Sequence, residues 1–322
     1  MSRHDEADFS KLTLRSIGAR ATRVGVGAFA KPGDPSAARA MIDQLPQFLG
    51  ANVLRDVVDA VVRSHAAGRP VVVLLGAHVI KVGVAPYLVQ LIERGVIRHL
   101  AMHGAGAIHD AEIALFGRTS EDVEANLASG AFGMVEETPA FFHAAAAEGR
   151  ARREGLGEAL GRALVEARAP HADVSLLAVA SKAGIPATVH VALGTDTIHA
   201  HEKADGAALG ETSLRDFRIL AHTLREARGA TVLNLGSAVL LPEVFLKALT
   251  AAVNLGASID ELTTVNVDQI QHYRPRVNVV ERPTQGTGSR GLALTGHHEI
   301  LVPLLAQAIL ARVPAGMSVA RS

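Results

Sequence analysis

Val71-Val72-Val73-Leu74-Leu75 is an unbroken apolar run, and Gly76-Ala77-His78 follows it directly. A short run rich in β-branched residues and bounded by glycine is typical of a strand that is buried on both faces of a sheet. An amphipathic stretch follows at residues 84–93. The whole segment therefore predicts a strand, a glycine turn and a helix, which is the repeating unit of parallel sheets.

The same order recurs along the chain. Further strands are predicted at residues 96–102, 186–193, 230–235 and 262–267, and further helices at residues 242–253 and 299–311. Strands and helices in alternation indicate parallel strands joined by right-handed crossovers. The expected fold class is therefore α/β, with a doubly wound parallel sheet covered by helices on both faces.

Two segments fall outside the alternation. Residues 1–50 are expected to form an N-terminal arm, with a loop at Lys31-Pro32-Gly33-Asp34-Pro35, and residues 51–322 a single Rossmann-like α/β domain. Residues 138–168 are rich in Ala, Glu and Arg and predict a long helix with weak points at Gly149 and Gly155.

Composition limits the classes of partner. The chain has 32 basic and 32 acidic residues, so bulk charge does not favour nucleic acid or an anionic membrane. It has no cysteine, which excludes disulfides, thiol nucleophiles and cysteine-ligated metals. The charged opening Met1–Ser16 is unlike a secretory signal, and no apolar stretch is long enough to span a bilayer. We expect a cytoplasmic protein with a small-molecule substrate.

Polar and small residues follow the predicted strands. Ligands of open parallel sheets bind beyond the carboxyl ends of the strands, where backbone N–H groups and helix N-termini converge. A single turn of this kind is a common connection between a strand and a helix, but five of them on the same predicted edge favour a ligand-binding site. The candidate cofactor-binding residues there are Gly76, Ala77, His78, Gly104, Ala105, Gly106, Asp110, Thr195, Asp196, Gly236, Ser237 and Asn266.

A glycine-rich segment near the C-terminus adds a second candidate. Gly286-Thr287-Gly288-Ser289-Arg290-Gly291 combines flexible backbone, hydroxyl groups and a guanidinium, which suits phosphate. We include Gly288 and Ser289 among the cofactor-binding candidates, although a plain surface loop explains the segment equally well. The arginine-rich stretch 272–276 suits carboxylate or phosphate, or else salt bridges within the protein.

Histidine residues suggest both catalysis and a metal. Imidazole titrates near neutral pH and serves as a general base. His199, His201 and His297 supply three nitrogen ligands for an alternative metal site. No tight metal signature such as H-E-x-x-H is present, so the leading expectation is NAD and no metal.

Several segments together resemble the deoxyhypusine synthase family over about residues 42–310. His103–Asp110 is similar to its Thr-Ala-Gly-Gly…Glu-Asp turn, and residues 185–196 to its Val-Pro…Ala-Leu-Thr-Asp strand end. The other similar segments are residues 74–83, 91–97, 233–239, 265–269 and 302–305. The resemblance implies a Rossmann-like NAD-binding fold and a homotetramer in which a partner subunit completes the site.

One departure bears on the reaction. The family carries an aminobutyl group as an imine on a lysine near the C-terminus, and imidazole cannot form a stable imine of this kind. This chain has no lysine after Lys247, and Leu241-Pro242 stands where the family has Lys-His. We therefore expect an NAD-dependent enzyme that acts on a small polar substrate by oxidation-assisted transfer or elimination. The candidate catalytic residues are His103, His109, Asp196, His199 and His297.

Three alternatives remain open from the sequence. The chain could be an NAD-dependent aminoalkyl transferase that uses a soluble amine acceptor. It could be a metal-dependent hydrolase or lyase built on the three histidines named above. It could also be a non-catalytic sensor of NAD or of another metabolite.

Overall fold

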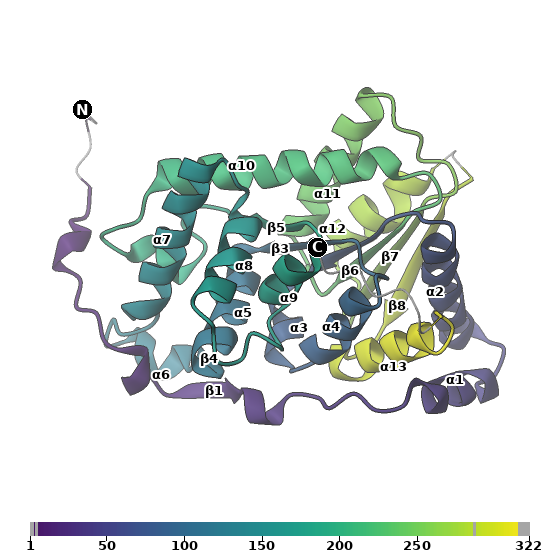
Figure 1. Cartoon of the computed structure of the whole chain (residues 1–322), viewed down its shortest axis with the longest axis horizontal. Helices are drawn as coiled ribbons and strands as arrows, with labels where there is room; N and C mark the ends of the chain where they lie inside the picture. The colour runs from purple at the N-terminus through teal and green to yellow at the C-terminus, as the bar shows by residue number, and fades with distance from the viewer. Residues whose placement is uncertain (1–2, 4–5, 286–287, 315–322) are drawn as a thin grey trace.

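The computed structural model of the protein describes residue 3 and residues 6–285 and 288–314. Its centre is a six-stranded parallel sheet in the order β5-β3-β2-β6-β7-β8 (Figure 1). The strands are β2 (Val71–Leu75), β3 (His99–His103), β5 (Ala187–His190), β6 (Thr231–Leu235), β7 (Thr263–Asp268) and β8 (Arg290–Thr295). The chain runs outward from β2 to β5 and then from β6 to β8 in the other direction. The doubly wound sheet is therefore confirmed, and its order reverses between β2 and β6.

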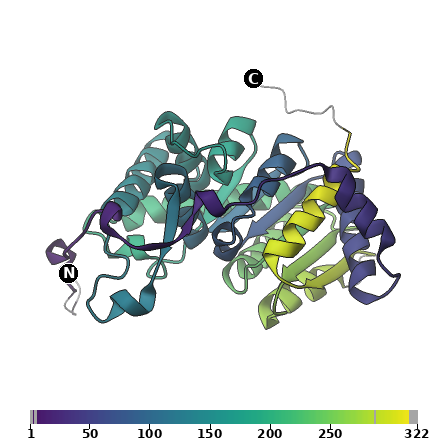
Figure 2. The same cartoon turned by 90° about the horizontal axis from the view of Figure 1, so that it is seen from below.

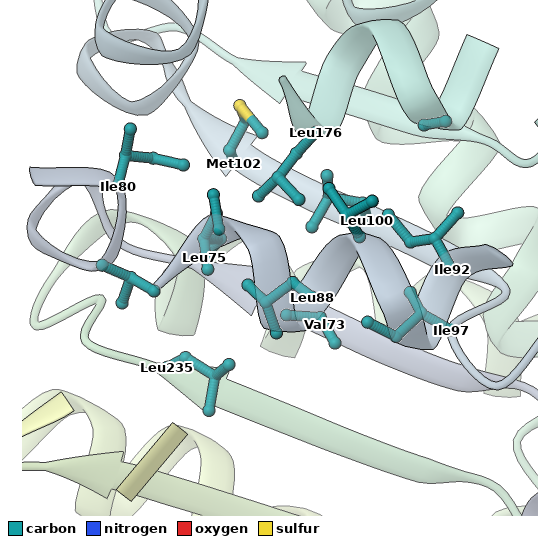
Figure 3. Close-up of a cluster of buried hydrophobic side chains, with 14 of the residues drawn as sticks. Val73, Leu75, Ile80, Leu88, Ile92, Ile97, Leu100, Met102, Leu176 and Leu235 are labelled. Carbon is teal, nitrogen blue, oxygen red and sulfur yellow. The ribbon is translucent and has the colours of Figure 1, made fainter. Parts of the chain in front are cut away.

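Helices cover both faces of the sheet. Val73 and Leu75 pack on one face and Leu74 on the other, so β2 is apolar at every position. Figure 3 shows Val73 and Leu75 in a cluster of buried side chains that also contains Leu88 and Ile92. The first layer contains α2 (Leu49–Ala66), α4 (Ala85–Glu93), α9 (Leu176–Ala183) and α13 (His298–Leu310), and the second contains α10 (Gly206–Thr223) and α11 (Leu240–Asn254).

The predicted long helix at residues 138–168 is wrong. Two helices, α7 (Glu137–Arg152) and α8 (Leu156–Glu166), replace it. Arg153 adopts a left-handed backbone with φ +61° and ends α7. A Cβ at Gly155 would lie 1.8 Å from the Asp216 carboxylate, so only glycine fits there. The break therefore lies at one of the predicted weak points.

The N-terminal arm lies along one side of the molecule (Figure 2). Its strand β1 (Thr22–Gly25) pairs antiparallel with β4 (Arg118–Glu121), and its helix α1 (Pro35–Gln44) packs on α13. Residue 50 lies inside α2. The division into an arm and a single domain stays a prediction.

The remaining elements are short or lie at the carboxyl ends of strands. β8 is a strand that the sequence did not predict, and β5 ends at His190 rather than at residue 193. No helix within the described ranges is long and apolar enough to cross a membrane. The other elements are α3 (Ala77–Lys81), α5 (Gly104–Phe116), α6 (Val123–Leu127), α12 (Tyr273–Pro275), and the short helices at 9–11, 17–19, 26–28, 197–200, 224–226, 276–281 and 282–284.

Candidate functional site

A cavity of about 240 Å³ lies beyond the carboxyl ends of β3 and β5, and we call it the carboxyl-edge cavity. Helix α5, strand β4 and the loop after β5 form its walls. The cavity is therefore at the edge of the sheet where the sequence predicts a site. Its polar lining consists of Arg20, Lys81, His109, Glu112, Ser120, Glu121, Thr195, Asp196 and Thr197.

A second, more open cavity of about 490 Å³ adjoins the first. The two share Lys81, Ser120, Glu121 and Val123 in their linings, and we call this pair of adjoining cavities the trough. Glu121 is paired with Arg15, whereas no ion pair joins Lys81 to an acidic side chain in the described part of the chain. The ammonium group of Lys81 therefore supplies a positive charge at the junction of the two cavities.

His109 is held by a chain of hydrogen bonds. Its Nδ1 lies 2.7 Å from Oγ1 of Thr119, and that hydroxyl donates to Glu112 at 2.5 Å. Because the Thr119 proton goes to Glu112, the hydroxyl oxygen accepts from Nδ1–H of His109. This assigns the tautomer with the lone pair on Nε2. Nε2 of His109 is then the atom available as a base.

Glu112 anchors that chain inside the protein. Its carboxylate is 2% exposed, accepts from Arg20 at 2.7 Å and accepts from Thr138 Oγ1 at 2.8 Å. Burial lowers the pKa of His109 to about 4, and Glu112 opposes this shift only in part. His109 is therefore neutral at pH 7, and burial makes it a weaker base than an imidazole in water.

Asp196 lies against the N-terminus of α5. A Cβ at Gly104 would lie 2.0 Å from Oδ2 of Asp196, so glycine makes room for the carboxylate. Burial raises the pKa of Asp196 to about 6. His199 fixes this loop, because its Nδ1 accepts from the backbone N–H groups of Gly194 at 3.1 Å and Asp196 at 3.2 Å.

The backbone is tightly packed where the sheet order reverses. Gly76 donates to Leu235 O at 2.8 Å, and a Cβ on Gly76 would lie 2.1 Å from Gly236 O. Gly236 has φ +70°, and a Cβ there would lie 2.8 Å from the ring of His298. The predicted glycines thus allow close approach of β2, β6 and α13 at this point.

The trough brings together some predicted site residues and not others. His78, Ala105, His109, Thr195 and Asp196 line it, and Gly104 touches Asp196. Gly106 packs α5 against Met102. Ala77 N–H donates to Nε2 of His103 at 3.4 Å, which uses the lone pair that a base would need.

Other predicted residues have structural contacts away from the trough. Asp110 is buried and accepts from Ser175, Leu176 and Leu177, so it caps α9. Asn266 is buried within β7 and bonded to Asn234 at 2.7 Å. Ser237 is buried and accepts from the backbone of α11.

The candidates near the C-terminus lie elsewhere. β8 begins at Arg290, so Gly288 and Ser289 precede a strand and lie at the amino edge, which corrects their expected place in the carboxyl-edge site. His297 is exposed and follows β8, whereas His199 and His201 follow β5. β5 and β8 are opposite edges of the sheet, about 24 Å apart at the usual strand spacing. The described residues contain no cluster of three side chains that could hold a metal ion, so the alternative three-histidine site is wrong.

Sequence reasoning missed Lys81, Glu112 and Thr119 as parts of the site. His109 and Glu112 are three residues apart on one helix, so their shared face was a usable local signal. Arg20 was not foreseeable, because it reaches the site from the N-terminal arm through pairing that only the fold reveals.

No protein-family model matches the chain. No curated protein matches its sequence. Among solved structures, a candidate deoxyhypusine synthase from Entamoeba histolytica superposes with a TM-score of 0.50 at 10% identity, and the match covers 88% of this chain and 98% of that one. This likeness confirms the predicted α/β fold of the deoxyhypusine synthase type. It shows a related fold and not membership of the family.

Two further structures are similar to a lesser degree. A candidate LOR/SDH protein from Methanococcus maripaludis S2 has a TM-score of 0.49 at 15% identity, over 88% of this chain and 72% of that one. AgrE, solved with ornithine and NAD+, has a TM-score of 0.49 at 15% identity, over 88% of this chain and 34% of that one. The chain spans about a third of the length of AgrE and 31% of that of the cyanobacterial arginine dihydrolase ArgZ.

Proposed function

We propose that the protein is an NAD-dependent enzyme that oxidises a small polar substrate in the carboxyl-edge cavity. The observation that carries the proposal is His109, a neutral and oriented imidazole in a cavity at the carboxyl edge of a sheet with the dinucleotide-binding strand order. The oxidised carbon would then be activated for transfer or elimination.

A cation for the pyrophosphate of a dinucleotide is present. Lys81 lies at the junction of the two cavities, where it would neutralise charge on a pyrophosphate. Asp196 occupies the N-terminus of α5, so a pyrophosphate would pair with Lys81 rather than with that helix end. NAD, when bound, supplies a hydride acceptor.

The chain's own residues would handle the proton. Nε2 of His109 would take the proton from the hydroxyl or amine group on the substrate carbon that is oxidised. Thr119 and Glu112 hold the ring and stabilise its charged form through Nδ1–H. Glu121, with its Arg15 partner, lines the same cavity, whose volume suits a small substrate.

A homo-oligomer, with a tetramer as the expected form, is part of the proposal. Large apolar side chains are exposed after several strands at the carboxyl edge, namely Leu193, Val239, Ile270 and Ile300. A partner subunit would cover them. Light scattering should therefore give a mass well above that of one chain, and a monomer at micromolar concentration would contradict this part.

Calorimetry and kinetics on the full chain test the proposal. We expect NAD to bind with micromolar affinity, roughly −8 kcal/mol. A panel of small alcohols and primary amines, spermidine included, identifies a substrate by NADH formation. His109→Gln should then slow turnover by about a hundredfold to ten-thousandfold and change NAD affinity little.

His222→Gln is the matched control, because His222 is exposed on α10 and lies outside both cavities. It should behave like the unaltered protein. Thr119→Val should reproduce part of the His109→Gln defect, since it frees the ring without removing it. The proposal is wrong if NAD does not bind at millimolar concentration, or if His109→Gln turns over normally.

A further inference from the structure

A large cavity lies at the amino edge of the sheet, away from the trough. Its volume is about 620 Å³, and its lining includes four arginines, Arg63, Arg69, Arg228 and Arg290. We call it the arginine cavity. Arg69 precedes β2, Arg228 precedes β6 and Arg290 begins β8. These strands are parallel, with β7 between β6 and β8, so all three arginines lie at the amino edge of the sheet.

The arginine cavity has a surplus of positive charge. Glu261 is the only acidic side chain in its described lining. Arg290 pairs with Asp56 at 2.8 Å, but no ion pair joins Arg63, Arg69 or Arg228 to an acidic side chain in the described parts of the chain. The chain as a whole has equal numbers of acidic and basic residues, so this surplus is local.

Hydrogen bonds fix the turns that carry Arg69 and Arg228. The Ser64 hydroxyl is buried and donates to Gly229 O at 2.8 Å, next to Arg228. Arg98 donates to Gly68 O at 3.0 Å, next to Arg69. Among the residues that the structure describes, none comes within 4 Å of the place a Cβ at Gly288 would take.

We propose that the arginine cavity binds a small molecule that carries two or more phosphate groups. The guanidinium group of an arginine binds a phosphate through two parallel hydrogen bonds. Several arginines in one cavity therefore suit a ligand with more than one phosphate group. The volume is that of a small-ligand site. The proposal gives Gly288 and Arg290 the phosphate-binding role that their sequence suggests, at the opposite edge from the NAD-binding trough and independently of it.

Calorimetry with inorganic pyrophosphate and with ADP on the full chain tests this. Arg69→Ala and Arg228→Ala should each weaken binding by about tenfold, because each removes a charged hydrogen-bonding group. Arg228→Lys should weaken it less. The affinity should fall as salt concentration rises.

A control variant makes the result specific. Arg225→Ala removes an exposed arginine of the same turn region that lies outside the cavity, and it should leave affinity within about twofold of the unaltered protein. Losses in Arg225→Ala equal to those in Arg69→Ala and Arg228→Ala, or no binding at millimolar concentration, would each overturn the proposal.

Discussion

Asp216 shows how a single buried carboxyl group connects three elements. It lies in α10 and accepts from the backbone N–H groups of Gly157 at 2.9 Å and Val189 at 2.7 Å, through Oδ2 in both cases. Burial raises its pKa to about 8, against the opposing effect of these hydrogen bonds. The group is therefore mainly protonated at neutral pH in the folded protein, whereas it is ionised in the unfolded chain.

The free energy of unfolding should therefore depend on pH. Between about pH 4 and pH 8 the folded state binds more protons at Asp216 than the unfolded state, so the free energy of unfolding falls as pH rises. Asp216→Asn keeps the accepting oxygen and should flatten this slope. Asp216→Ala leaves two buried N–H groups without an acceptor and should cost about 1–3 kcal/mol for each. Denaturant unfolding across this pH range measures both effects, and an unchanged slope in Asp216→Asn would contradict the assignment.

At the scale of elements, the sequence pattern predicts the strands and helices whose composition is determined by burial and by local residue spacing. β2 was predictable because both of its faces are buried, which makes it uniformly apolar. β8 was missed because it is an edge strand with alternating exposure and an internal Gly291. Asp110 was expected to contact the ligand, but it caps α9. Its partner Leu176 lies 66 residues away in sequence, so no local pattern indicated this role.

The candidate site was predictable to a similar extent. The turn after β3, the loop after β5 and His109 were foreseeable from residues that follow strands. Arg20 and the wall from β4 depend on the pairing of β1 with β4, which links segments about a hundred residues apart and leaves no local pattern.

The contact of α5 with the loop after β5 gives a prediction at this scale. Gly104→Ala should displace Asp196 and destabilise the protein by about 1–3 kcal/mol, because the new methyl group overlaps the carboxylate. Asp196→Gly in the same chain should recover part of the loss. Gly210→Ala is the control in α10, where a Cβ meets nothing within 4 Å, and it should stabilise by about 0.5–1 kcal/mol. Equal stability of Gly104→Ala and Gly210→Ala in denaturant unfolding would refute the contact.

At the scale of the whole molecule, the sheet separates two kinds of surface. Its carboxyl edge has the trough with His109, Lys81 and Asp196, and its amino edge has the arginine cavity. The strand order determines this arrangement, because parallel strands present all their carboxyl ends on one side. NAD and a polyphosphate ligand should therefore bind without competing directly.

Hydrogen exchange of the full chain with and without saturating NAD tests the central claim most directly. The account predicts that NAD slows exchange in residues 77–84, 104–112 and 193–200, which surround the trough, and leaves residues 67–70 and 227–230 at the amino edge unchanged. No change at the carboxyl edge, or protection confined to the amino edge, would contradict the account.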